Sequence, residues 1–159
     1  QGVGSPRAAA CSPSAMWIVG DYSSFRVVGG KVEAMDPMAD LLLPADWRAV
    51  WVSLDGQAFL AGEARYLLHW TGEKFQAMDQ PANVPIQSIQ ALWGTGPGNL
   101  WAGGVMRDGA SFLIHFNGAF WQPVDPGMDA PLGALTGIAS GDLWLGGASG
   151  ALVRGTLNP

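Results

Sequence analysis

Four basic side chains occupy one repeated position in this sequence. Arg26, His69 and His115 each lie between apolar residues shortly before a hairpin turn, and Arg154 takes the same position near the end of the chain. A ring of such cations would bind an anion. Alternatively, each side chain donates hydrogen bonds to a backbone carbonyl or an acidic group of a neighbouring segment and ties the two together. The sequence leaves both interpretations open.

Metal and catalytic chemistry find little support. His69 and His115 are 46 residues apart with no cysteine near them, so the spacing of a zinc site is missing. Cys11 is the single cysteine, which excludes an internal disulfide. The glycine-rich stretch 94–98 precedes neither the lysine nor the helix of a phosphate loop, and the chain has no Gly-x-Ser-x-Gly elbow. We therefore predict no catalytic residue, no metal and no cofactor.

Binding is the more promising chemistry, and two kinds of candidate residue support it. Trp47, Trp70 and Trp121 would serve a carbohydrate site if their indole faces are exposed for stacking. Protein contacts are expected on the loops 36–46, 79–85 and 106–110. The first loop contains the apolar run Leu41, Leu42 and Leu43, which would pack against a partner or form an unusual connection within the fold.

The composition favours many short strands and excludes two classes of partner. The chain of 159 residues is 48% hydrophobic and 13% charged, with 23 Gly and 11 Pro, which argues against disorder. A net charge of −5 with two lysines provides no basic patch for nucleic acid or a membrane surface. No apolar run approaches the roughly 20 residues of a membrane-spanning helix.

A sequence repeat indicates which secondary-structure elements position these residues. An aromatic residue followed three positions later by glycine occurs four times, at intervals of 42, 42 and 43 residues. The pairs are Trp17 and Gly20, Phe59 and Gly62, Trp101 and Gly104, and Trp144 and Gly147. A fixed period of this size indicates one supersecondary unit repeated along the chain.

Each copy predicts four short strands in a meander. In the third copy they fall at 88–95, 100–105, 111–116 and 120–125, and Asn117-Gly118 is the strongest two-residue hairpin signal. Four antiparallel strands of this length form one blade of a β-propeller. The other strands are predicted at 7–11, 16–19, 24–28, 31–36, 47–54, 58–61, 66–70, 74–79, 134–139, 143–146 and 151–154.

The repeated aromatic and glycine residues have a structural interpretation. Each aromatic lies on the second strand of its copy, where it would fill the space between neighbouring sheets packed about 10 Å apart. The glycine ends that strand, where a side chain would crowd the next blade or where a positive φ is needed. We therefore assign all eight residues to blade packing.

The predicted fold is an all-β propeller of four-stranded antiparallel blades, formed as a single domain by residues 1–159. The last copy lacks a fourth strand, and too few residues precede the first strand to supply it. The chain is therefore half of a larger propeller completed by a second copy or by further sequence, a four-bladed ring with one three-stranded blade, or an open arc against a partner. We favour the first, because an unpaired edge invites aggregation. The repeats fall at about 7–45, 46–87, 88–131 and 132–159.

With the copies aligned, the chain resembles Trp-rich, kelch-like β-propeller repeats. The resemblance rests on glycines that close the second strand (Gly103-Gly104, Gly146-Gly147) and on the aromatic–Gly–aromatic hairpins 69–75 and 115–121. It resembles in particular repeats of secreted proteins built on Leu-Trp-x-x-Gly and His-Trp-x-Gly-x-x-Trp. The chain lacks the regular Tyr/Trp pair of kelch and the Ser-x-Asp-x-Gly-x-Thr-Trp box of sialidase-type propellers, so the resemblance implies no glycosidase activity.

These observations lead to an expected function of binding without catalysis. We expect a protein-binding or assembly module, a subunit of an extracellular or periplasmic complex, whose partner is another protein or a second copy that completes the ring. The alternative is a carbohydrate-binding, lectin-like propeller. An enzyme would need two or more acidic or basic side chains converging on the propeller axis, and the fold alone hosts either kind of activity.

Overall fold

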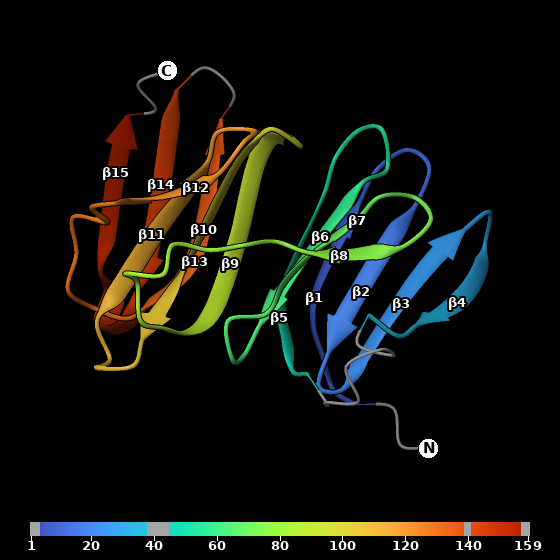
Figure 1. The fold of residues 1–159 in the computed structure, drawn as a ribbon, viewed down its shortest axis with the longest axis horizontal. Helices are drawn as coiled ribbons and strands as arrows, with labels where there is room; N and C mark the ends of the chain where they lie inside the picture. Colours follow the sequence, from blue (N-terminus) through green and yellow to red (C-terminus); the bar gives the residue numbers. More distant parts are fainter. Residues whose placement is uncertain (1–3, 38–44, 139–140, 157–159) are drawn as a thin grey trace. The chain divides into compact units, whose positions relative to one another are not determined.

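The computed structural model describes residues 4–37, 45–138 and 141–156, which form 15 β-strands in four antiparallel sheets (Figure 1). Helical structure in these ranges is limited to the single turn η1 (Ala148–Gly150), and no helix there is long and apolar enough to cross a membrane. Each sheet is a meander whose strands follow one another in chain order. The all-β prediction is confirmed.

The chain divides into two compact units, Gln1–Met78 and Asp79–Pro159, and each unit contains two sheets. The first unit holds sheet 1, formed by β1 (Pro6–Cys11), β2 (Met16–Gly20), β3 (Ser23–Val28) and β4 (Lys31–Met35), and sheet 2, formed by β5 (Trp47–Val52), β6 (Ala58–Gly62), β7 (Leu67–Trp70) and β8 (Phe75–Ala77). The second unit holds sheet 3, formed by β9 (Ile86–Gly96), β10 (Asn99–Met106), β11 (Ser111–Phe116) and β12 (Trp121–Val124), and sheet 4, formed by β13 (Leu132–Ile138), β14 (Asp142–Gly147) and β15 (Leu152–Thr156).

The predicted strands are found close to their expected positions. β9 begins at Ile86, two residues before the predicted start of the third repeat. Sheet 4 has three strands in the described part of the chain, as the shortened last copy predicts. The repeat period therefore corresponds to one sheet, and the sequence places all four sheets correctly.

The hairpin between β11 and β12 shows how the turn sequence fixes a strand connection. Gly118 has φ 92°, a left-handed conformation that glycine adopts without a steric penalty. The Oδ1 atom of Asn117 accepts hydrogen bonds from the backbone N–H groups of Ala119 and Phe120, at 3.1 Å each. The side chain thus satisfies turn donors that have no partner in the ladder.

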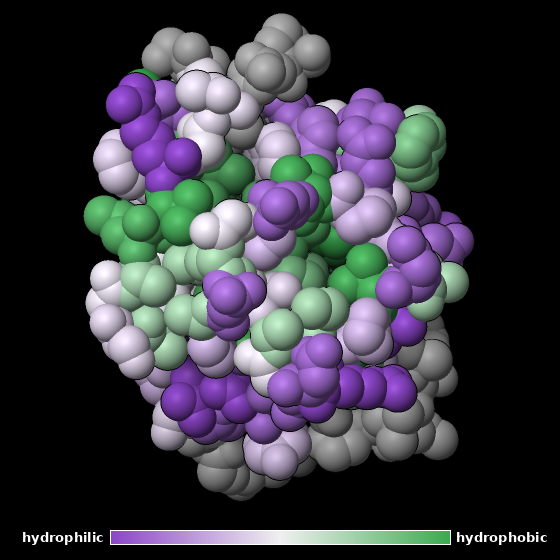
Figure 2. Space-filling model, turned by 90° about the vertical axis from the view of Figure 1, so that its left-hand side faces the viewer, coloured by the Kyte–Doolittle hydropathy of each residue, from purple (hydrophilic) through white to green (hydrophobic). Residues whose placement is uncertain are grey.

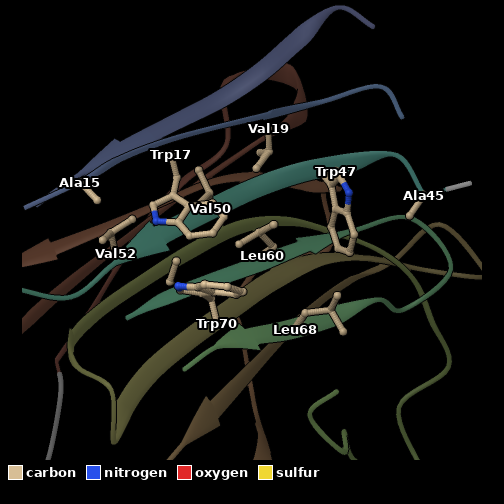
Figure 3. Close-up of a cluster of buried hydrophobic side chains, with 11 residues drawn as sticks. Ala15, Trp17, Val19, Ala45, Trp47, Val50, Val52, Leu60, Leu68 and Trp70 are labelled. Atoms are coloured by element: carbon tan, nitrogen blue, oxygen red, sulfur yellow. The ribbon is translucent and has the colours of Figure 1, made fainter. Parts of the chain in front are cut away.

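In the first unit, sheet 1 packs on sheet 2 through a buried apolar cluster (Figure 3). The indole of Trp17 lies 5.8 Å from the Trp70 ring and 5.9 Å from the Phe75 ring, both centroid to centroid. Val50, Val52 and Leu60 complete the sheet 2 side of this cluster, and all are buried. Trp17, the repeated aromatic of sheet 1, therefore fills the gap between two sheets, as predicted.

The second unit repeats this arrangement. Trp101 of sheet 3 belongs to one buried cluster with Leu143 and Leu145 of sheet 4, and Leu132 lies in the same cluster. In both interfaces, one sheet contributes its repeated aromatic. The other sheet contributes the residues immediately before and after its own repeated aromatic. The core of each unit lies between its two sheets.

Candidate binding site

The repeated basic residue stands directly opposite the repeated aromatic in every sheet. The cross-strand pairs are Trp17 with Arg26, Phe59 with His69, Trp101 with His115, and Trp144 with Arg154. Directly opposite residues of an antiparallel pair have their side chains in contact on one face. The basic residues are therefore part of the same repeated pattern as the aromatics.

The two histidines stack on their aromatic partners. The His69 and Phe59 ring centroids are 4.4 Å apart, and those of His115 and Trp101 are 4.2 Å apart. The Nε2–H of His69 donates to Gln57 Oε1 at 2.7 Å, and that of His115 donates to Asn99 Oδ1 at 2.6 Å. Partial burial lowers the pKa of each imidazole, because desolvation disfavours the charged form. Both side chains therefore act as neutral donors at neutral pH.

The two arginines form ion pairs instead. Arg154 binds Asp142 through both carboxylate oxygens at 2.9–3.1 Å, and Arg26 lies 3.6 Å from Glu33. These partners lie in the same sheet as the basic residue, so the expectation that each basic side chain ties one blade to the next is wrong in its choice of partner. Arg26 also reaches sheet 2, with its guanidinium carbon 5.9 Å from the Trp70 ring centroid.

The three proposed carbohydrate-stacking residues are all buried. Trp47 and Trp70 belong to the buried cluster between sheets 1 and 2, and Trp121 is buried against Phe116, with ring centroids 5.3 Å apart. A stacking platform needs an aromatic face open to solvent, which these three indoles do not offer. The sequence could not reveal this, because buried and sugar-binding tryptophans have the same side chain.

The structure describes the four repeated aromatics but not the apolar run of the first loop. Leu41, Leu42 and Leu43 fall outside the described residues, and so does most of the loop 36–46. Of the four repeated aromatics, Trp17, Phe59 and Trp101 are buried, whereas Trp144 is 38% exposed. Trp144 therefore fills no gap between sheets in the described part of the chain.

The repeated glycine is required by the first strand of its own blade. It stands opposite Pro6, Trp47, Ile89 and Leu132 in sheets 1 to 4. A Cβ atom on Gly62 would lie 2.0 Å from the backbone oxygen of Asp46, and one on Gly20 would lie 2.1 Å from that of Ser5. Gly104 is similarly crowded by the carbonyl of Ser88 at 2.2 Å, whereas a Cβ on Gly147 would make a less severe contact, 3.0 Å from Met128 Cε and 3.1 Å from the carbonyl oxygen of Pro131. Crowding by the next blade, or a positive φ, is therefore not the reason for these glycines.

The close approach coincides with a β-bulge at the same position of each first strand. The ladder skips one residue next to the repeated glycine, and we call this the bulge residue. The residue after the glycine, which we call the post-glycine residue, lies beside it. The pairs of bulge and post-glycine residues are Arg7 and Asp21, Arg48 and Glu63, Gln90 and Val105, and Gly133 and Ala148.

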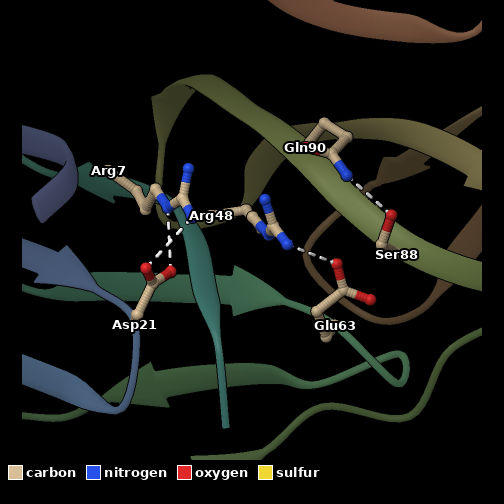
Figure 4. A network of polar contacts seen from close by, with 6 residues as sticks. All are labelled: Arg7, Asp21, Arg48, Glu63, Ser88 and Gln90. Carbon is tan, nitrogen blue, oxygen red and sulfur yellow. Dashed lines mark hydrogen bonds and ion pairs between the residues drawn. The ribbon is translucent and has the colours of Figure 1, made fainter. Parts of the chain in front are cut away.

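In the first unit both of these pairs are ionic (Figure 4). The Nε and Nη2 atoms of Arg7 donate hydrogen bonds to the two carboxylate oxygens of Asp21, at 2.8 and 3.0 Å. The Nη2 atom of Arg48 donates one to Glu63 Oε1 at 2.8 Å. The hydrogen bond from Arg7 lowers the pKa of the Asp21 carboxyl, because it favours the ionised form. Long arginine side chains therefore occupy the bulge positions of sheets 1 and 2, and their charges are neutralised by the paired carboxylates.

In the second unit the same positions carry short or uncharged residues and form a pocket. Gln90, Val105, Gly133 and Ala148 all line an open pocket of about 500 Å³ between sheets 3 and 4. Its remaining lining is Pro131, Leu132, Ala134, Gly146 and Gly147. No atom lies within 4 Å of the point where a Cβ on Gly133 would stand, which shows how open the wall is there.

The pocket provides shape, apolar surface and one amide, but no reactive group. The Nε2 of Gln90 donates to Ser88 Oγ at 2.7 Å, and the N–H of Ala148 donates to Pro131 O at 2.9 Å. No acid, base or nucleophilic side chain is among its lining residues. Across the described ranges, His, Cys, Asp and Glu form no group of three that could hold a metal.

Sequence reasoning missed this pocket. The bulge adds a residue to one strand only, so a search for alternating polarity does not detect it. A signal was nevertheless present at aligned positions: the opposite charges of Arg7 and Asp21, and of Arg48 and Glu63, give way to uncharged residues in the later copies. A lost pair of charges at one repeated position marks the pocket.

Comparison with known proteins identifies the fold. No protein-family model matches the sequence, and no curated protein sequence matches it. The structure is similar to YCF48 with a bound D1 peptide (TM-score 0.65, 16% identity) and to YCF48 from Cyanidioschyzon merolae (TM-score 0.72, 15% identity). The aligned region covers 98% of this chain in both cases, and 55% and 54% of the respective YCF48 chains. It is also similar to the computationally designed protein Ika4 (TM-score 0.69, 14% identity), covering 99% of this chain and 94% of the designed one.

The chain thus has the β-propeller fold, with four blades of antiparallel strands. It spans about half the length of the YCF48 chains that it matches. The finer resemblance to kelch-like repeats rests on sequence motifs alone. Identities of 14–16% establish the architecture and leave the activity to be argued from the site.

Proposed function

We propose that this chain is a non-enzymatic, protein-binding propeller module that holds an extended segment of a partner protein. The pocket between sheets 3 and 4 would receive an apolar side chain of that segment. The observation that carries the proposal is the loss of both ionic pairs at the bulge positions of these two sheets, which leaves an open, uncharged pocket of about 500 Å³.

The lining suits a peptide better than a charged ligand. An aliphatic side chain would gain from leaving water for the Val105, Leu132 and Ala148 walls, at about 25 cal/mol per Å² of buried apolar surface. The amide of Gln90 and the exposed backbone of the Gly133 segment offer hydrogen bonds to a peptide main chain. One structural neighbour, YCF48, is known with a bound D1 peptide, which supports this class of ligand for the fold.

The test fills the pocket with the pair that the chain itself uses elsewhere. Gly133→Arg combined with Ala148→Glu copies Arg48 and Glu63 of sheet 2, and the open space at Gly133 admits the new side chain. An array of short peptides that varies one central residue serves as the probe. We expect binding to peptides with a central Leu or Ile, and loss of that binding in the double variant without a change in melting temperature.

A matched control separates the pocket from the mere addition of charge. Gly96→Arg introduces the same side chain at another glycine with no atom within 4 Å of its Cβ position and outside the pocket lining. This variant should bind the peptides like the parent chain. No peptide binding by the parent, or equal binding by the double variant, would refute the proposed site. A glycan array run in parallel would support the lectin alternative if it alone gave a signal.

We further propose that the module acts in an extracellular or periplasmic complex. The support is the resemblance to Leu-Trp-x-x-Gly and His-Trp-x-Gly-x-x-Trp repeats of secreted proteins. Fractionation of the source cells, with an antibody raised against the chain, tests this location. Recovery of the protein in the cytoplasmic fraction would contradict it.

A further inference from the structure

The two faces of each sheet have different roles in packing. We call the face that carries the repeated aromatic the aromatic face, and the other the opposite face. In the first unit, Trp17 on the aromatic face of sheet 1 packs on Trp70 and Phe75, which lie on the opposite face of sheet 2. In the second unit, Trp101 on the aromatic face of sheet 3 packs with Leu143 and Leu145 on the opposite face of sheet 4. Both interfaces therefore use the same pair of faces in the same order.

The aromatic face of sheet 4 is uncovered in the described part of the chain. Trp144 is 38% exposed, Ile138 55% and Leu152 66%, although all three are large apolar residues. The side of the molecule that carries β14 and β15 shows a band of apolar residues with polar residues above and below it and a few polar residues among them (Figure 2). An apolar patch with a polar rim is typical of a contact surface.

The opposite face of sheet 1 is also left uncovered by the residues that the structure describes. One cross-strand row on it consists of Cys11, Met16, Val27 and Val32, one residue from each strand. Met16 is 38% exposed, Val32 is 68% exposed, and Cys11 is an exposed free thiol. The equivalent row of sheet 2 is Val52, Ala58, Trp70 and Phe75, against which Trp17 packs.

We propose that two copies of this chain associate by placing the aromatic face of sheet 4 of one copy on the opposite face of sheet 1 of the other. Trp144 then lies on the row formed by Met16, Val27 and Val32, as Trp17 lies on Trp70 and Phe75. This surface is separate from the role proposed for the pocket, and the inference does not depend on that role. It adds a second copy of the chain as a specific partner.

The argument for a second copy is the continuity with the two interfaces inside the chain. The uncovered faces are one aromatic face and one opposite face, which are the two kinds that pack together in both units. The ion pair of Arg154 and Asp142 does not oppose the contact. Its counterpart Arg26 makes an ion pair with Glu33 and also lies over the Trp70 ring of the adjoining sheet, 5.9 Å from its centroid.

Light scattering coupled to size-exclusion chromatography tests the proposal on the 159-residue chain. We expect a mass of twice the 16.7 kDa monomer. Ile138→Lys with Leu152→Lys alters the face of sheet 4, and Met16→Glu with Val32→Glu alters the face of sheet 1. Each double variant should halve the observed mass. Leu54→Lys is the matched control, because Leu54 is 87% exposed on a turn outside both faces, and it should leave the mass unchanged.

Mixing the two double variants distinguishes this contact from others. The sheet 4 face of one variant and the sheet 1 face of the other remain intact, so the mixture should regain a complex of one copy of each. If only the sheet 4 variant dissociates, the contact joins two identical faces and the proposal is wrong. A mass that rises without limit with concentration also overturns it, because a contact that does not close adds copies indefinitely.

The reactivity of the Cys11 thiol is a second measurement, and it tests the contact in the parent chain even if a variant misfolds. Cys11 lies in the proposed contact and is the single thiol of the chain, so its reaction with a thiol reagent reports on coverage. The reaction should slow in the parent chain as its concentration rises, and it should not slow in the sheet 4 variant. A parent chain that stays at 16.7 kDa with a thiol of constant reactivity would refute the association.

Discussion

The imidazole of His69 lies parallel to the phenyl ring of Phe59, with 2° between the two planes and 4.4 Å between the centroids. His115 and Trp101 form the same kind of stack in sheet 3, at 22° and 4.2 Å. Each histidine also donates its Nε2–H to a side-chain amide at the start of the neighbouring strand, Gln57 just before β6 and Asn99 at the start of β10. The two residues are thus part of the blades, which determines how the protein responds to acid.

The protein should lose stability as the pH falls below about 6.5, the ordinary pKa of histidine. Burial lowers the pKa of His69 and His115 in the folded state, so the unfolded chain takes up protons first as the solution is acidified. The stability that they contribute is fully present above the unfolded pKa and is lost as the pH falls. Urea unfolding followed by tryptophan fluorescence between about pH 7.5 and about pH 5.5 measures this slope.

The double variant His69→Gln, His115→Gln should abolish the slope in this window. Asp21→Asn is the control, because the hydrogen bond from Arg7 lowers the pKa of the Asp21 carboxyl and moves its effect to more acidic solutions. An undiminished slope in the histidine variant would assign the pH response to other groups.

Gly62→Ala should destabilise the protein by about 3 kcal/mol, as expected for overpacking against a backbone that cannot move away. The new Cβ would meet the Asp46 carbonyl oxygen at 2.0 Å and the Trp47 Cα at 2.9 Å. Chemical denaturation provides the free energy of unfolding. Gly96→Ala, at a glycine with no atom within 4 Å, should change it by less than about 0.5 kcal/mol. Equal effects of the two substitutions would contradict the close approach of the first strand.

Trp17→Ala should cost about 3–5 kcal/mol of unfolding free energy, the range for truncating a large aromatic in a core. Trp144→Ala, at the equivalent position of sheet 4, should cost much less in dilute solution because Trp144 is 38% exposed. Thermal unfolding of both variants at low protein concentration makes the comparison. Equal losses would show that Trp144 is covered within a single chain.

The ion pair of Arg48 and Glu63 should contribute only about 0.2–1 kcal/mol, since both side chains are partly exposed. A double-mutant cycle with Arg48→Met and Glu63→Gln measures the coupling energy. Added salt should reduce it, because ions screen exposed charges. A larger coupling that is insensitive to salt would indicate a role beyond this exposed contact.

The sequence predicted the fold almost completely because the repeat carries its information in local patterns. Alternating apolar residues, turn glycines and Asn117-Gly118 each determine a short segment without reference to the rest of the chain. Trp17 lies between two sheets as its place on a middle strand predicts, whereas Trp144 on the middle strand of sheet 4 is 38% exposed, because burial also requires a second sheet over that face. Strand ends differed by one or two residues, as at Ile86.

The site was not predictable in the same way, because it depends on an irregular register. The bulge at Arg7, Arg48, Gln90 and Gly133 is created by an approach between two strands that no single segment encodes. The partners of the basic residues were also hidden. Gln57, Asn99 and Asp142 each lie two positions before the repeated aromatic, on the same face of the strand, and that spacing becomes meaningful only once the pairing is known.

The extra residue in each first strand gives the blades one freely variable position. The ladder runs past it, so a substitution there leaves the strand pairing intact. The four copies already contain arginine twice, glutamine and glycine at this place. The side chain at this position can consequently change after a blade is duplicated, one residue at a time, while the architecture stays constant. A combinatorial library limited to residues 7, 48, 90 and 133 would sample the side chains that this position accepts.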